Sequence, residues 1–111
     1  MKSFFIVSDN NKKSESIKSK LLKNIKSSSL KKSEIIVVIG GDGFMLQVLK
    51  KLYKFKKPFY GINSGDYGFL MNKFHEKNFL KNISKGEIMI IFAFDKFLII
   101  FFNENLFIKK P

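Results

Sequence analysis

One aspartate in this sequence stands among three glycines, in the run Gly40, Gly41, Asp42, Gly43. Glycine tolerates backbone conformations that other residues avoid and lets a ligand come close, so such a turn can face its amides toward phosphate. A carboxylate held there can act as a general base or hold a divalent ion. The run therefore indicates phosphate chemistry that uses Asp42. The simpler alternative is a strand-to-helix turn in which Asp42 is the N-cap.

The elements expected around this turn place it at the end of a buried strand. Residues 35–39 are consecutive β-branched apolar residues, which is typical of a strand buried on both faces, and residues 44–54 have helical spacing. In open α/β sheets ligands bind beyond the carboxyl ends of the strands, and a helix N-terminus favours phosphate. The run has neither the Lys-Ser/Thr of a P-loop nor the glycine spacing of the dinucleotide fingerprint.

A second irregular loop, residues 63–68, follows the next expected strand at residues 57–62. Because parallel strands end at the same edge of a sheet, the two glycine-bearing loops can form a shared crevice. Asn63 opens the second loop and offers a ligand both hydrogen-bond donors and acceptors. The alternative is a turn that serves as the entry to a helix.

The two loops together resemble the N-terminal domain of bacterial NAD kinases. The resemblance is carried by Gly-Gly-Asp-Gly-Phe-Met-Leu at 40–46 and by Asn-Ser-Gly-Asp-Tyr-Gly-Phe-Leu at 63–70. The first motif is shared with diacylglycerol-type lipid kinases, whereas the second, Asn-x-Gly-x-x-Gly-Phe-Leu, is more specific. Two alternatives stay open: a lipid-kinase fragment, and a basic binding module without enzymatic activity.

The resemblance implies transfer of the terminal phosphoryl group of ATP, or of polyphosphate, to the 2′-hydroxyl of the adenosine ribose of NAD, which gives NADP. It also implies Mg²⁺ or another divalent cation, and Asp42 as the catalytic residue. No separate metal site built from protein side chains is predicted. The residues that would bind the nucleotides are Gly41, Asp42, Gly43, Asn63, Phe69, Asn103 and Glu104.

The order of the expected elements predicts an α/β fold: a doubly wound, Rossmann-like parallel sheet followed by the beginning of a β-rich second domain. Residues 1–86 would form the α/β nucleotide-binding domain, and residues 87–111 the start of an incomplete β-sandwich domain. Two β-rich runs, 88–94 and 97–102, predict a hairpin in the second part. The earlier elements are strands at 3–8, 35–39 and 57–62 and helices at 14–24, 44–54 and 77–83.

The predicted hairpin, with few residues after it, would show a large apolar face to water. The resemblance also leaves the family's later adenine- and ribose-binding segments without a counterpart in this sequence. We therefore expect a truncated or split product whose activity alone is doubtful. Such a product would form a homo-oligomer or need the missing C-terminal part.

The formal net charge is +12, and all 21 basic residues are lysines. Surfaces specialised for nucleic acids usually use arginine for bidentate contacts, so we do not expect nucleic acid as a partner. A positive surface would instead attract small nucleotides or polyphosphate. The sequence has no cysteine, which agrees with a reducing cytoplasm, and its apolar runs are too short to cross a membrane.

Overall fold

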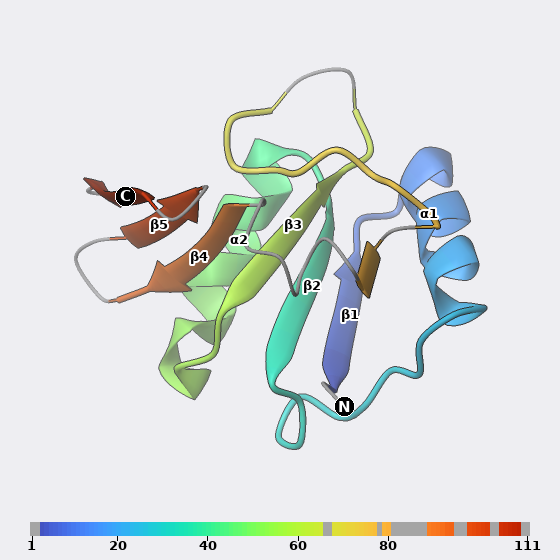
Figure 1. Ribbon diagram of the computed structural model, residues 1–111, viewed down its shortest axis with the longest axis horizontal. Helices are drawn as coiled ribbons and strands as arrows, with labels where there is room; N and C mark the ends of the chain where they lie inside the picture. The colour runs from blue at the N-terminus through green and yellow to red at the C-terminus, as the bar shows by residue number, and fades with distance from the viewer. Residues whose placement is uncertain are drawn as a thin grey trace.

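The computed structural model describes residues 3–65, 68–77, 79–80, 89–94, 98–102 and 105–109. These residues form one six-stranded sheet in the order β1-β2-β3-β4-β5-β6 (Figure 1). The first three strands are parallel, and the pairings from β3 to β6 are antiparallel. The strand bounds are Phe4–Ser8 (β1), Ile35–Gly40 (β2), Phe59–Asn63 (β3), Met89–Ala93 (β4), Leu98–Phe102 (β5) and Asn105–Lys109 (β6).

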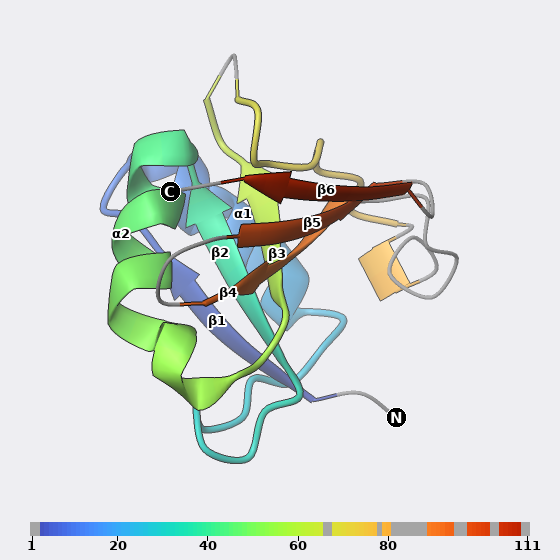
Figure 2. The ribbon, with the colours of Figure 1, turned by 90° about the vertical axis from the view of Figure 1, so that its left-hand side faces the viewer.

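Two helices cover opposite faces of the parallel strands: α1 (Lys12–Leu22) and α2 (Asp42–Leu52). The alternating side chains of β2 show this arrangement. Val37 belongs to the core cluster that contains Leu21 of α1, and Val38 to the cluster that contains Met45 of α2. In Figure 1 α2 lies behind the sheet, and the quarter turn in Figure 2 places it beside the sheet. The predicted α/β class with a doubly wound parallel sheet is confirmed.

The central strand β2 is buried along its whole length, from Ile35 to Gly40. Its near-continuous apolar sequence suits this position, because both of its faces pack against a helix layer. Each fully buried valine or isoleucine contributes about 1.5–3 kcal/mol to stability relative to its exposed state. This strand therefore fixes where the Gly40–Gly43 turn begins.

The chain touches the outer side of β1 before it enters β2. Ser27 forms a parallel bridge with Phe4, and the amide of Ser28 donates to the carbonyl of Phe4 at 2.7 Å. From β1 the chain therefore runs outward past this edge and then returns inward to β2. Such a reversal is the topological switch point at which open α/β sheets bind ligands.

Both helices begin two residues earlier than predicted, at residues 12 and 42 instead of 14 and 44. For α1 the cause is Asn11, whose Oδ1 accepts the amides of Lys13 at 2.8 Å and Ser14 at 3.4 Å. Asparagine is a favoured N-cap because its side chain satisfies amides that the helix leaves open. Of the helix predicted at 77–83, Phe79 and Leu80 are helical, and 78 and 81–83 lie outside the described residues.

The predicted hairpin is confirmed as the antiparallel pair β4 and β5. One of its faces is not open to water: Ile91, Leu98 and Ile100 are buried in the cluster beneath α2. The expectation of a large apolar face toward solvent is therefore wrong for this side of the hairpin. Because β4 pairs with β3, these strands continue the parallel sheet, and the division into domains at residue 86 stays a prediction.

Candidate functional site

The carboxylate of Asp42 joins the two glycine-bearing loops. Its Oδ2 accepts the amide of Phe69 at 2.8 Å, and its Oδ1 accepts the amide of Leu70 at 2.9 Å. Asp42 is the first residue of α2, whose N-cap is Gly41, and the helix start has no side-chain cap. The alternative in which Asp42 caps its own helix is therefore wrong, because the side chain reaches across to the second loop.

The glycines around Asp42 are needed for space rather than for unusual backbone angles. None of the six described glycines has a φ in the left-handed region. A Cβ on Gly68 would lie 3.0 Å from Oδ1 of Asp42, so a side chain there would push the carboxylate away. At Gly41 and Gly43, by contrast, no described residue beyond the adjacent backbone has an atom within 4 Å of the position that a Cβ would take.

This open space adjoins the start of α2, where backbone amides have no partner within the helix. A helix N-terminus carries a partial positive charge that favours anions. Since no side chain caps α2, its first turn is available to a phosphate group. The arrangement agrees with the phosphate-binding role predicted for Gly41 and Gly43, which stays a prediction.

Asn63 ends β3 at the same edge of the sheet. Its Oδ1 accepts the amide of Gly65 at 3.0 Å, and its own amide donates to the carbonyl of Asn72 at 2.8 Å. Because Oδ1 accepts this bond, the NH₂ group of the side chain points elsewhere. That group donates to none of the described residues, so Asn63 can still donate to a ligand oxygen.

A buried pair of serines next to Asn63 was not anticipated from the sequence. Oγ of Ser14 in α1 donates to Oγ of Ser64 at 2.6 Å, and the amide of Ser64 donates to the carbonyl of Gly40 at 3.0 Å. The available signal was a serine on the apolar stripe of α1, three and seven residues before Ile17 and Leu21.

Residues 3–88 match the family model of the ATP-NAD kinase N-terminal domain. The chain belongs to the ATP-NAD kinase family. Among curated relatives, the NAD kinase of Rickettsia felis is 42% identical over 62 residues, which are 56% of this chain and 24% of that protein. The NAD kinase of Caulobacter vibrioides is 42% identical over 59 residues, which are 53% of this chain and 23% of that protein. The match therefore spans about a quarter of each relative.

The region that matches the ATP-NAD kinase family contains five of the seven predicted nucleotide-binding residues. Of these, Phe69 exposes 68% of its surface, although its amide is bound to Asp42. Asn103 and Glu104 lie outside both the matched region and the described residues, so their predicted contacts with the nucleotide stay predictions.

The part of this chain that the structure describes has no group of three or more histidine, aspartate or glutamate side chains placed to hold a metal. Within the same described part, no helix is long and apolar enough to span a membrane.

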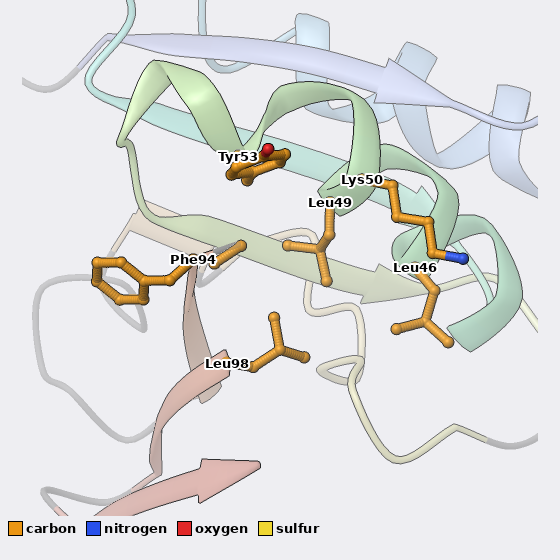
Figure 3. A pocket seen from close by; sticks show the side chains of 7 residues that line it. Leu46, Leu49, Lys50, Tyr53, Phe94 and Leu98 are labelled. Atoms are coloured by element: carbon orange, nitrogen blue, oxygen red, sulfur yellow. The ribbon is translucent and has the colours of Figure 1, made fainter. Parts of the chain in front are cut away.

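A cavity of about 190 Å³ lies away from Asp42, between α2 and the β4–β5 hairpin. Leu49 of α2 and Leu98 of β5 point toward each other across it (Figure 3). Among the described residues, its lining is apolar except for Lys50 and Tyr53 and includes no carboxylate or amide side chain. The cavity thus has no candidate general base among the lining residues that the structure describes, so the sheet edge at Asp42 is the candidate site.

Proposed function

We propose that this chain carries the acid-bearing and phosphate-binding part of an NAD kinase. The reaction transfers the terminal phosphoryl group of ATP, or of polyphosphate, to the 2′-hydroxyl of the adenosine ribose of NAD. The observation that carries the proposal is the carboxylate of Asp42, which is bound to the amides of Phe69 and Leu70 and so joins both motifs at one sheet edge.

The proposed mechanism assigns Asp42 the role of general base. Each of its oxygens accepts one amide and keeps a second acceptor position. The 2′-hydroxyl oxygen attacks the terminal phosphorus, its proton passes to Asp42, and the bond from phosphorus to the ADP oxygen breaks. Phosphoryl transfer depends mainly on positioning and charge neutralisation, which Mg²⁺ brought with ATP would supply.

The other residues of the site position the two substrates. The amides at Gly41 and Gly43 would face phosphate oxygens, where the start of α2 has open space. The NH₂ group of Asn63 would donate to a ribose hydroxyl or a phosphate oxygen. The exposed ring of Phe69, next to the amide that Asp42 accepts, would line the nucleotide pocket. Asn103 and Glu104 would contact ribose hydroxyls or the nicotinamide side of NAD.

Substitution of Asp42→Asn tests the general base. We expect NADP formation to fall about 100-fold or more, since the variant has no base. The asparagine NH₂ would also face a backbone N–H of Phe69 or Leu70, donor against donor, which costs about 1–3 kcal/mol of stability. Activity is therefore measured well below the melting temperature of the variant, with circular dichroism to show that it is folded.

Glu34→Gln is the matched control for this experiment. Glu34 is an exposed carboxylate at the opposite end of β2, so the change removes one charge without touching the site. We expect its NADP formation to equal that of the unaltered protein. If Asp42→Asn is folded and as active as Glu34→Gln, Asp42 is not the base.

The purified chain, with NAD, ATP and Mg²⁺, also tests the proposal against the two alternatives. Saturable binding of NAD by calorimetry, together with NADP formation, supports an NAD kinase. Phosphorylation of diacylglycerol without NADP formation would support the lipid-kinase alternative. Binding that ignores nucleotide identity and collapses with added salt would support a basic binding module.

A further inference from the structure

The buried serine pair, Ser14 and Ser64, connects segments 50 residues apart in the chain. Ser14 is 0% exposed and Ser64 is 6% exposed, so water does not compete for their hydrogen bond. A buried hydroxyl that loses its partner keeps the cost of its desolvation. The bond therefore holds the first turn of α1 against the loop that follows β3.

Ser64 is also held from a second direction. Its amide donates to the carbonyl of Gly40, the last residue of β2, at 3.0 Å. The residue before it is Asn63, whose side chain is turned by its bond to the amide of Gly65. Ser64 thus joins α1, the last residue of β2 and the loop that follows β3, and it does so beside the proposed ligand donor.

A comparison with Ser33 shows that this geometry is more than a satisfied core serine. Ser33 is 4% exposed, and its Oγ donates to the carbonyl of Leu30 at 2.9 Å, three residues earlier in the same turn. Oγ of Ser33 also accepts Nζ of Lys57 at 3.4 Å, and both contacts lie at the amino end of β2, away from the sheet edge that carries Asp42. The bond from Ser14 instead crosses from a helix to the loop that carries Asn63, at the carboxyl end of the parallel strands.

We infer that Ser14 is a positioning residue for NAD binding, because through Ser64 it fixes Asn63 at the sheet edge. Ser14 does not itself touch the nucleotide. The predicted effect of Ser14 on NAD binding rests on the proposed function. The predicted effect of Ser14 on the position of the loop does not depend on that function. The two parts can therefore be measured separately on the same variants.

The experiment compares Ser14→Ala with the matched control Ser33→Ala in the full chain. Ser14→Ala removes the bond to Ser64, whereas Ser33→Ala removes the bond to the carbonyl of Leu30 and a 3.4 Å contact from Nζ of Lys57. We expect both variants to melt at somewhat lower temperatures than the unaltered protein. Calorimetry should show about fivefold weaker NAD binding for Ser14→Ala and no change for Ser33→Ala, as expected for loss of one ordinary hydrogen bond. Ser64→Ala and the double variant should match Ser14→Ala within about twofold, because all three break the same bond.

The rate of amide hydrogen exchange measures how firmly the loop is held in the absence of any ligand. We expect the Ser64 amide, which donates to Gly40, to exchange faster in Ser14→Ala but not in Ser33→Ala. If NAD binds and both variants bind it equally well, the inference is overturned and the proposed function stands. If the unaltered chain binds NAD neither alone nor when supplied with the C-terminal part of an NAD kinase, the proposed function fails. Faster exchange at Ser64 would then still support the role of Ser14 in the loop, and unchanged exchange would overturn it.

Discussion

Gly41 and Gly43 differ from the other glycines of the site because no described residue fills the space beside them. A Cβ on Gly40 would lie 2.8 Å from the ring of Phe44, and a Cβ on Gly68 would lie 3.0 Å from Asp42. Within the described part of the chain, nothing beyond the adjacent backbone comes within 4 Å of that position at Gly41 or Gly43. Protein packing alone therefore explains the first two glycines, while the other two leave room that a ligand can use.

Substitution of Gly43→Ala separates these two uses of glycine. Because Gly43 lies in the first turn of α2 with open space beside it, we expect the stability to stay the same or rise by up to about 1 kcal/mol. The added methyl group would occupy the space that we assign to phosphate, so NADP formation should fall about tenfold or more. Thermal unfolding and the turnover assay measure the two effects. Full activity in a stable variant would show that the ligand does not use this space.

At the level of elements, α2, β3 and the second loop meet at Gly61. A Cβ there would lie 2.7 Å from Cε of Met45, 2.7 Å from Sδ of Met71 and 3.0 Å from the carbonyl oxygen of Leu70. The backbone of β3 therefore approaches both the helix and the loop as closely as it can. The bonds between Asp42 and the loop depend on this approach, since Leu70 takes part in both.

We expect Gly61→Ala to destabilise the protein by about 1–3 kcal/mol, because the methyl group overpacks the space between the two methionines. The loop should also move away from α2, so the amide of Leu70 should exchange faster. Chemical denaturation and hydrogen exchange measure these effects. Gly65→Ala is the control: its Cβ would meet Oδ1 of Asn63 at 3.6 Å, an ordinary contact. Equal stability of the two variants would contradict this packing argument.

At the level of the whole molecule, Tyr60 connects the sheet to the segment near residue 79. It is 2% exposed, and its ring meets that of Phe79 edge-to-face at 5.5 Å. Burial raises the pKa of the Tyr60 hydroxyl from 10.0 to about 12 because the phenolate would lose its hydration. The neutral form is therefore the one that the fold favours.

This pKa predicts a loss of stability at alkaline pH. The contribution of Tyr60 is fully present below the unfolded pKa of 10.0 and is lost as the pH rises through about 12. Its full size is about 3 kcal/mol. Denaturation between these pH values should show a steeper loss for the unaltered protein than for Tyr60→Phe, which has no proton to lose. The same slope in both proteins would show that Tyr60 does not govern the alkaline transition.

The order of strands and helices could be predicted from the sequence because the signals are local. The apolar run at 35–39 and the apolar helix stripes that include Leu21 and Met45 indicate which segments bury a face. These patterns can be recognised without knowing which other segments they pack against. Parallel strands share an edge, so the loops at 40–43 and 63–68 were expected to lie together. The bond from the Ser64 amide to the carbonyl of Gly40 confirms this placement, as do the bonds that Asp42 accepts from Phe69 and Leu70, directly after the second loop.

Only the tertiary structure decided which groups meet at that edge. Asp42 accepts hydrogen bonds from backbone amides 27 and 28 residues away. Almost every residue has a backbone amide, so residue types do not indicate which amide will be the partner. Ser14 and Ser64 are unremarkable as residue types, and their bond exists because α1 packs beside β3's end. Likewise, β4 continues the sheet because β3 offers it an open edge. Local patterns determine the elements, whereas contacts between distant segments depend on the positions that packing gives to all of them together.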